Sequence, residues 1–98
     1  MKELIRTKVF DKWLYKLKDI KGKFIINERL ERLEIGDYGD SKPIINGNGI
    51  CELRIHYGGY RVYYIEKDNE VVVLLIGGDK DSQIRNIKLA KKLAKYYS

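Results

Sequence analysis

The stretch that most constrains the fold is residues 52–64, which read ELRIHYGGYRVYY. Apolar and polar residues alternate up to Gly58 and Gly59 and alternate again after them. A period of two is typical of a strand whose two faces lie in different surroundings. Two consecutive glycines accept the positive φ angles of a type I′ turn between antiparallel strands. The sequence therefore predicts a β-hairpin formed by residues 50–57 and 60–66.

A two-residue loop would also determine which residues of this hairpin face one another. His56 would lie opposite Arg61, and Arg54 opposite Tyr63. One face would then pack on a core through Leu53, Ile55, Val62 and Tyr64. The other face would carry two guanidiniums, an imidazole and a phenol, with the Cβ atoms of opposed residues about 4.5–5.5 Å apart.

These four side chains suit the chemistry of a phosphate. Arginine donates two parallel hydrogen bonds to phosphate oxygens, and histidine titrates near neutral pH. Cleavage of RNA by its own 2′-hydroxyl needs a base, an acid and cations for the charge that develops on the phosphate. The predicted catalytic residues are Arg54, His56, Arg61 and Tyr63. The alternative interpretation is a solvated strand face on which Glu52 and Arg54 form a surface ion pair.

The N-terminal third predicts a short strand followed by two helices. Residues 2–6 suit a strand, and the apolar residues from Phe10 to Ile20 follow helical spacing after a candidate N-cap at Thr7. Gly22 interrupts this pattern, and a second helix runs from there to Gly36, the predicted C-terminal cap. The short connection near residues 21–22 predicts an antiparallel helix hairpin.

The rest of the chain predicts further strands and a last helix. Residues 36–49 are rich in Gly, Asp and Asn and suit a loop with a brief extended stretch at residues 43–45. Residues 71–76 are continuously apolar, as in a strand buried on both faces. A helix is expected over residues 81–97, capped by Asp81 or Ser82. Its predicted apolar stripe is Ile84, Ile87, Ala90, Leu93, Ala94 and Tyr97.

This order of elements predicts the fold class. The chain of 98 residues is long enough for one domain, residues 1–98. We expect an α+β fold in which an N-terminal strand and a helix hairpin pack on an antiparallel β-sheet, with a C-terminal helix.

The net charge of +6 lies on the segments predicted to be helical, because residues 1–35 and 79–98 are each net positive and residues 36–78 net negative. A basic surface favours polyanions such as RNA or DNA, or an acidic protein partner. The alternative is that lysines solvate the outer faces of the helices.

Composition also bounds the compartment and the chemistry. No apolar run has the length of a membrane helix, and Met1 is followed by Lys2 and Glu3 without an apolar signal core, so we expect a cytoplasmic protein. The single Cys51 suits a reducing compartment and is predicted to be a core residue. One His, one Cys and scattered acidic residues lack the spacing of metal ligands, so neither a metal nor another cofactor is expected.

Four stretches of the chain resemble one known group of proteins. They are FDKWLYKLKD, RLERLEIGDYGDSKPI, GICELRIHYGGYRVYY and VVVLLIGGDKDSQIRNIKLAKKLA. In these stretches, which span nearly the whole chain, the sequence resembles the RelE/ParE toxin superfamily. The resemblance is to its HigB-like branch of phage-derived addiction module killer proteins in particular.

The resemblance implies the toxin of a type II toxin–antitoxin system. Such a toxin inhibits translation by cutting mRNA on the ribosome, without a metal, and a small helix-turn-helix antitoxin (HigA-like) neutralises it. The arginine of the GYR motif, which contributes to catalysis in related toxins, corresponds to Arg61, and basic positions of the preceding strand correspond to Arg54 and His56. The residues implied to bind RNA are Lys42, Lys80 and Gln83.

The chain differs from well-studied RelE toxins at three positions. Glu52 stands where they carry a basic residue, Asp81 where they carry an arginine, and Ile87 where they carry a tyrosine. If this chain cleaves RNA, His56 and Tyr63 would have to cover the proton transfers. Two alternatives stay open at this point: a ParE-like protein that poisons DNA gyrase by binding alone, and an inactive nucleic-acid-binding domain.

Overall fold

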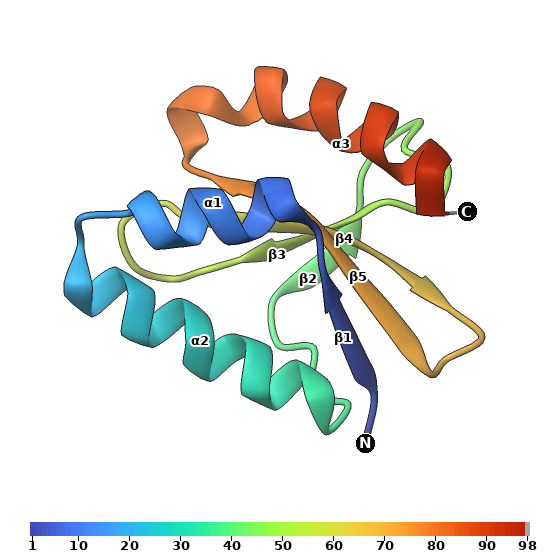
Figure 1. Ribbon diagram of the computed structural model, residues 1–98, viewed down its shortest axis with the longest axis horizontal. Helices are drawn as coiled ribbons and strands as arrows, with labels where there is room; N and C mark the ends of the chain where they lie inside the picture. The colour runs from blue at the N-terminus through green and yellow to red at the C-terminus, as the bar shows by residue number, and fades with distance from the viewer. Residues whose placement is uncertain (98) are drawn as a thin grey trace.

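A five-stranded sheet with helices on both faces forms the protein, as the computed structural model of residues 1–97 shows (Figure 1). The predicted α+β order of strand, two helices, strands and C-terminal helix is confirmed. In chain order the elements are β1 (Glu3–Arg6), α1 (Lys8–Lys16), α2 (Ile20–Glu34), β2 (Ser41–Pro43), β3 (Cys51–Arg54), β4 (Arg61–Lys67), β5 (Val71–Gly78), a short 3-10 helix (Lys80–Ser82) and α3 (Gln83–Tyr97).

The sheet has the strand order β1-β5-β4-β3-β2. Strands β3, β4 and β5 form the predicted antiparallel meander. The extended stretch expected at residues 43–45 is instead strand β2 at Ser41–Pro43, which pairs antiparallel with β3, whereas β1 pairs with β5 in parallel. The α1–α2 hairpin connects β1 at one edge to β2 at the other, so it crosses a whole face of the sheet. A parallel pair needs such a crossover connection, whereas the strands of the meander are joined by short loops.

The predicted ends of the first helix pair are largely confirmed. The Thr7 hydroxyl accepts a hydrogen bond from the Phe10 N–H at 2.9 Å and caps α1. Gly36 follows α2 with φ of 87°, as expected for a residue just past a helix end. The 3-10 helix that leads into α3 is capped by Asp79 rather than by Asp81 or Ser82, because its carboxylate accepts hydrogen bonds from both of their N–H groups.

The break between α1 and α2 lies at residues 17–19 and not at the predicted residues 21–22. Asp19 caps α2 by accepting a hydrogen bond from the Gly22 N–H at 2.9 Å. Gly22 lies inside the first turn of α2, where an added Cβ would stand 2.8 Å from the Tyr60 ring. This glycine therefore allows close packing of a ring and does not end a helix.

Two apolar cores lie on the two faces of the sheet. Beneath α1 and α2 the buried side chains are Phe10, Leu14, Ile26, Leu30, Leu33, Leu53, Ile55, Val62, Tyr64, Val72 and Leu74. Beneath α3 they are Ile50, Tyr63, Ile65, Val73, Leu75, Ile76 and Ala90. Consecutive residues of β5 thus enter opposite cores, which confirms that this strand is buried on both faces.

Two side chains lie farther from the core than predicted. Ile84 is 80% exposed, because the first turn of α3 directs Gln83 and Asn86 toward the sheet instead. Cys51 is half-buried at the margin of the first core. Within residues 1–97, no helix combines the length and the apolar character needed to cross a membrane.

Candidate functional site

The β3–β4 hairpin closes through a longer loop than predicted. Gly58 and Gly59 have positive φ angles of 67° and 70°, as a type I′ turn requires. However, the Ile55 N–H donates to the Tyr60 carbonyl, and Arg54 lies opposite Arg61. The predicted register is therefore wrong by two residues, and residues 56–59 form the loop.

Tyr60 accounts for this longer loop. Its hydroxyl donates to the Asp19 carboxylate at 2.9 Å, and the Tyr57 hydroxyl donates to the same carboxylate at 3.4 Å. The hydrogen bonds from the Gly22 N–H and from Tyr60 hold the pKa of Asp19 below its ordinary value. Burial and the bond to Asp19 raise the pKa of Tyr60 to about 12. The loop tip is thus tied to the start of α2, a contact that local sequence does not reveal.

A shift of two residues leaves the faces of both strands unchanged, because side chains alternate with a period of two. The prediction that Leu53, Ile55, Val62 and Tyr64 face a core is confirmed, since all four belong to the core beneath α1 and α2. Arg54 and Arg61 lie on the opposite face, together with Glu52 and Tyr63.

Three of the four predicted catalytic side chains meet at one pocket. Arg54, His56 and Arg61 line a hollow of about 190 Å³ beside the hairpin loop, together with Asp40, Ile55, Gly59 and Tyr60. The Arg61 guanidinium also donates from Nη1 to the Gly59 carbonyl at 3.0 Å. Two permanent positive charges and the imidazole therefore border a space about large enough for one phosphate group.

Glu52 lies beneath these arginines and is only 3% exposed. Arg54 donates from Nε to its Oε1 at 3.0 Å, and the Arg61 Nε lies 3.6 Å from its Oε2. Gln83 of α3 donates to the same Oε2 at 2.9 Å. The predicted pair of Glu52 and Arg54 exists, but the expectation that it lies on the surface is wrong, because α3 covers the carboxylate.

His56 is paired with an acidic residue that the sequence did not suggest. Its Nε2 lies 2.7 Å from Asp40 Oδ2, and the imidazole is 74% exposed. The hydrogen bond from His56 and the charge of Arg54 hold the pKa of Asp40 below its ordinary value. Asp40 is thus a carboxylate that accepts, and His56 donates from Nε2.

A buried arginine positions Asp40. Arg29 of α2 donates from Nη1 to the Arg54 carbonyl at 2.7 Å and from Nη2 to the Tyr38 carbonyl at 3.0 Å. Gly39, with φ of 61°, lies against this guanidinium, where a Cβ would be 2.6 Å from Nη2. The Asp40 carbonyl in turn accepts from the Arg54 N–H. Helix α2 therefore ties the loop that carries Asp40 to the end of β3.

Tyr63 does not reach the pocket, and the expectation that it lies on an open face is wrong. Its side chain is completely buried beneath α3, and its hydroxyl has no hydrogen-bond partner within residues 1–97. Burial, and after it the charge of Glu52, raises the pKa of this phenol above its ordinary value. The cause is α3, which closes this part of the sheet face and leaves only the loop end open.

The residues expected to bind RNA have different surroundings. Lys42 is exposed on the edge strand β2, opposite Glu52, and its charge helps to keep Asp40 ionised. Lys80 is exposed beside the hairpin loop, with its Cγ 3.8 Å from the position of a Cβ on Gly59. Gln83 is engaged with Glu52. Neither lysine lines the pocket itself, but Lys80 lies next to Gly59 and Lys42 acts on the charge of Asp40, and both of these residues do line it. Gln83 holds Glu52.

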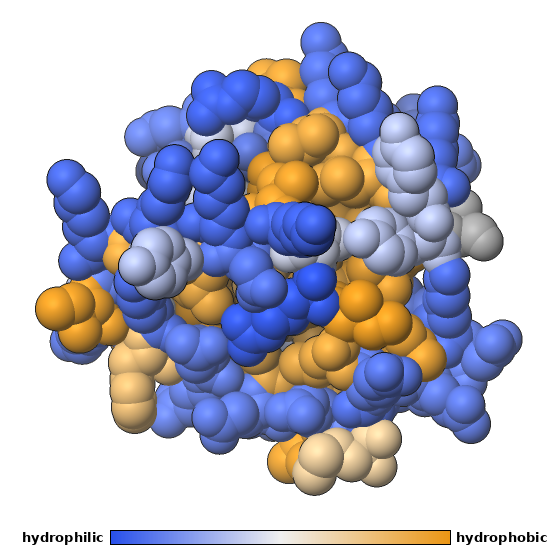
Figure 2. Space-filling view, in the orientation of Figure 1, coloured by the Kyte–Doolittle hydropathy of each residue, from blue (hydrophilic) through white to orange (hydrophobic). Residues whose placement is uncertain are grey.

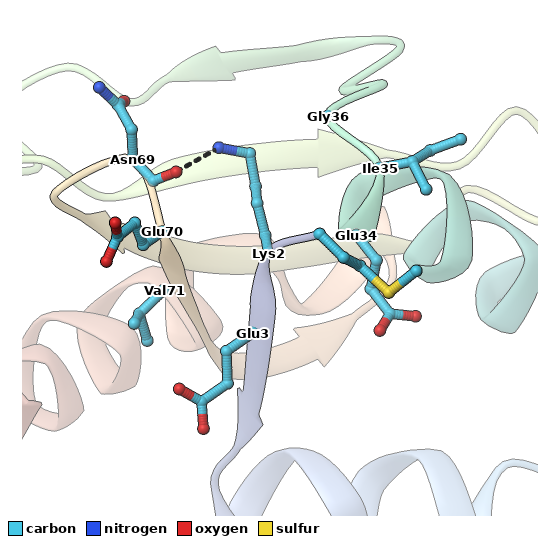
Figure 3. Close-up of a pocket in the computed structure, with 9 residues that line it drawn as sticks. Lys2, Glu3, Glu34, Ile35, Gly36, Asn69, Glu70 and Val71 are labelled. Atoms are coloured by element: carbon cyan, nitrogen blue, oxygen red, sulfur yellow. Dashed lines mark hydrogen bonds between the residues drawn. The ribbon is translucent and has the colours of Figure 1, made fainter.

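A larger pocket lies at the other end of β4 and β5. It measures about 790 Å³ and is formed by the start of β1, the end of α2 and the β4–β5 turn (Figure 3). Lys2 donates to the Asn69 carbonyl at 2.8 Å and to Glu66 at 2.6 Å. Tyr38 donates to the other oxygen of Glu66. These polar groups satisfy one another, so we interpret this region as the attachment of the N-terminus to the sheet.

Within residues 1–97, no three His, Cys, Asp or Glu side chains lie close enough together to hold a metal ion. Burial raises the pKa of Cys51, which favours the thiol over the nucleophilic thiolate. We therefore take Arg54, His56 and Arg61, which line the pocket beside the hairpin loop, as the candidate site.

Comparisons with other proteins identify a family and a fold. The family model "Phage derived protein Gp49-like (DUF891)" matches residues 12–95. A protein from Haemophilus influenzae, described as uncharacterized, is 49% identical over 89 residues, which are 90% of this chain and 88% of that protein.

Solved structures with the same fold include chains of two toxin–antitoxin complexes. The RelB–RelE antitoxin–toxin complex from Methanococcus jannaschii contains a chain that matches with a TM-score of 0.59 and 18% identity, over 84% of this chain and 96% of that one. The YoeB–YefM complex from Staphylococcus aureus gives a TM-score of 0.57 and 18% identity, over 76% and 91% of the two chains. A conserved hypothetical protein from Helicobacter pylori gives 0.55 and 22%, over 83% and 97%.

Proposed function

The chain belongs to the phage-derived Gp49-like family, and from this premise we propose that it is the toxin of a toxin–antitoxin pair and cleaves mRNA on the ribosome. The observation that carries the proposal is the meeting of Arg54, His56 and Arg61 at one phosphate-sized pocket. The fold shared with chains of the RelB–RelE and YoeB–YefM complexes supports it.

The proposed reaction is attack of a ribose 2′-oxygen on the adjacent phosphorus. A bond forms between the 2′-oxygen and phosphorus, and the bond from phosphorus to the 5′-oxygen of the next nucleotide breaks. The products are a 2′,3′-cyclic phosphate and a free 5′-hydroxyl. Arg54 and Arg61 would donate to the phosphate oxygens, where negative charge increases in the transition state.

His56 suits the removal of the 2′-hydroxyl proton. Because Asp40 accepts the proton on Nε2, a neutral imidazole carries its lone pair on Nδ1. That nitrogen makes no hydrogen bond within the part of the chain that the structure describes. After it accepts the proton, the imidazolium is stabilised by the Asp40 carboxylate, and solvent water protonates the departing 5′-oxygen.

The size of the pocket supports dependence on the ribosome. A space of about 190 Å³ holds a phosphate but not a whole nucleotide, so it orients little of the strand beyond the scissile bond. In-line attack needs the 2′-oxygen, phosphorus and 5′-oxygen to be aligned, and alignment contributes much of the rate of such reactions. A ribosome that holds mRNA in a bent conformation would supply this alignment, which places the reaction in the cytoplasm. Lys42 and Lys80 would contact neighbouring phosphates of the mRNA.

The α1–α2 hairpin is the surface we propose for the antitoxin. Tyr15, Ile20 and Phe24 are 83%, 82% and 68% exposed at its turn, where lysines surround them. Figure 2 shows apolar atoms protruding at this end of the molecule among hydrophilic ones. An acidic antitoxin segment with apolar side chains would complement this surface, and the resemblance to HigB-like toxins implies an antitoxin with a helix-turn-helix domain (HigA-like).

Brief induction of the protein in a bacterial host, followed by mapping of transcript ends, tests the proposed function. We expect new mRNA ends with 5′-hydroxyls, and cleavage of mRNA by the purified protein only when ribosomes are present. Arg61→Ala and His56→Ala should each lower cleavage by about 100-fold or more, the magnitude seen when one charge-stabilising or proton-transferring group is lost. Lys88→Ala, which removes an exposed cation on α3, should leave cleavage unchanged.

Two outcomes of the same experiment contradict the proposal. Intact transcripts together with a DNA-damage response would favour a ParE-like gyrase poison. Intact transcripts on purified ribosomes, with only salt-dependent RNA binding, would favour a nucleic-acid-binding domain without activity.

A further inference from the structure

Glu52 is the only acidic side chain that is buried within residues 1–97. Removing a carboxylate from water costs several kcal/mol unless close cationic partners compensate. The groups next to a buried carboxylate are therefore the ones that compensate for its burial. In this protein those groups are the two arginines of the candidate site.

The two oxygens of Glu52 are divided between the two guanidiniums. Oε1 accepts from the Arg54 Nε at 3.0 Å, and Oε2 lies 3.6 Å from the Arg61 Nε. Gln83 donates to Oε2 at 2.9 Å and thereby fixes the carboxylate from the side of α3. Each arginine thus faces Glu52 with its Nε edge. Arg61 uses Nη1 for the Gly59 carbonyl, so Nη2 of Arg61 and the terminal nitrogens of Arg54 are left for another acceptor.

Without Glu52 the arrangement of the arginines would be unfavourable. Arg54 and Arg61 lie directly opposite each other in the β3–β4 ladder, where two like charges repel. The Arg61 side chain is only 18% exposed, so solvent screens the charge of its guanidinium poorly. The carboxylate between them offsets this repulsion and determines their spacing.

We propose that Glu52 is a positioning residue that holds Arg54 and Arg61 at a fixed separation, with their terminal nitrogens toward the pocket. This inference rests on the proposed function in one respect, namely that the ligand is the phosphate of an RNA strand. Glu52 itself touches no substrate and acts through the two guanidiniums. It also explains how a chain with a carboxylate in this position keeps a phosphate site.

Three variants separate positioning from a role in charge or in folding. Glu52→Gln keeps the size and removes the charge, and Glu52→Asp keeps the charge but withdraws it by one methylene. Glu66→Gln is the matched control, because Glu66 is another paired carboxylate at the far end of β4. Unfolding in urea is recorded for each variant.

Two measurements are made on each variant. Cleavage of mRNA on purified ribosomes is compared with binding of an oligonucleotide that has a 2′-deoxyribose at the scissile position. Exchange of the Arg54 Nε–H proton, which donates to Glu52, is followed by ¹⁵N NMR, with the exposed Arg85 as the internal reference.

We expect Glu52→Gln and Glu52→Asp to lower cleavage by about 100-fold, the order of magnitude that follows when reacting groups move by an ångström. Binding of the deoxy oligonucleotide should be unchanged or tighter in Glu52→Gln, because the site gains net positive charge. The Arg54 Nε–H proton, which donates to Glu52, should exchange more slowly than that of Arg85 in the wild type, and faster in Glu52→Gln than in the wild type. Glu66→Gln should change none of these values.

Cleavage at the wild-type rate in Glu52→Gln would overturn the inference. Cleavage at the wild-type rate in Glu52→Asp but not in Glu52→Gln would also overturn it, because Glu52 would then act through its charge and not through its position. Should neither variant fold, rapid exchange of the Arg54 Nε–H proton in the wild type would still overturn it. If the wild-type protein does not cleave RNA, the proposed function fails. In that case the proton exchange and the affinity for inorganic phosphate still decide whether Glu52 positions the arginines.

Discussion

The two faces of the β3–β4 hairpin are built from alternate residues of the same two strands, yet the helices cover them to different extents. Leu53, Ile55 and Val62 enter a core that α1 and α2 close along its whole length. On the other face α3 closes the sheet over Tyr63 and stops short of the loop, where Arg54 and Arg61 reach a pocket. Alternation therefore decides which residues share a face, and the helices decide which of them reach solvent.

The largest effect should come from the closed face. Leu53 is fully buried, so Leu53→Ala should lower the free energy of unfolding by about 2–5 kcal/mol through lost burial and a residual cavity. Urea denaturation measures this change. Cleavage per folded molecule should stay at the wild-type value, and Leu53→Met, with a similar volume, should cost less than about 1.5 kcal/mol. A loss of cleavage in molecules that remain folded would mean that the two faces are not independent.

A smaller effect is expected where the loop tip meets the closed face. The pKa of Asp19 is lowered from its ordinary value of 3.8, so its charge stabilises the fold fully above that value and progressively less as pH falls through the lowered one. Asn also caps helices well, so Asp19→Asn removes mainly the charge.

Asp19→Asn should therefore be less stable than the wild type at pH 7, and the difference should shrink toward pH 2. Urea midpoints at pH 7, 4 and 2 measure it, with the exposed Asp11→Asn as the control. A difference that is the same at every pH would show that the Asp19 charge does not hold Tyr57 and Tyr60.

The smallest effect should come from a change at Tyr63. This residue lies on the part of the sheet face that α3 covers, so it tests where the covered part ends and the open part begins. Its hydroxyl is buried without a partner, so Tyr63→Phe should leave the free energy of unfolding unchanged or raise it by up to about 1 kcal/mol. Cleavage should also stay unchanged. A large loss of cleavage would instead show that Tyr63 takes part in catalysis, as the sequence predicted.

Local patterns predicted most of the fold. The Thr7 cap, the glycine after α2 and the continuous apolar run of β5 each depend on nearby residues, and the structure confirms all three. The division of β3 and β4 into two faces was also predictable, because a register shift of two residues leaves each side chain on the same face of the sheet.

The two helix starts that were placed wrongly depend on nearby caps, Asp19 and Asp79, whereas the errors at the site depended on contacts distant in sequence. The loop length follows from the bonds of Tyr60 and Tyr57 to Asp19, some forty residues earlier in the chain. Asp40 reaches His56 only because β2 pairs with β3, and the burial of Glu52 needs Gln83 of α3. Alternation within a strand contains no information about these neighbours.

The parallel pairing of β1 with β5 has a consequence for biosynthesis. Thr7 donates through its hydroxyl to the Leu75 carbonyl, 68 residues later, and residues 3–6 pair with residues 71–74. A growing polypeptide thus carries its first strand unpaired until the fifth has left the exit tunnel. The site strands β3 and β4 emerge earlier, so the sheet edge next to the N-terminus can close only after they have left the tunnel.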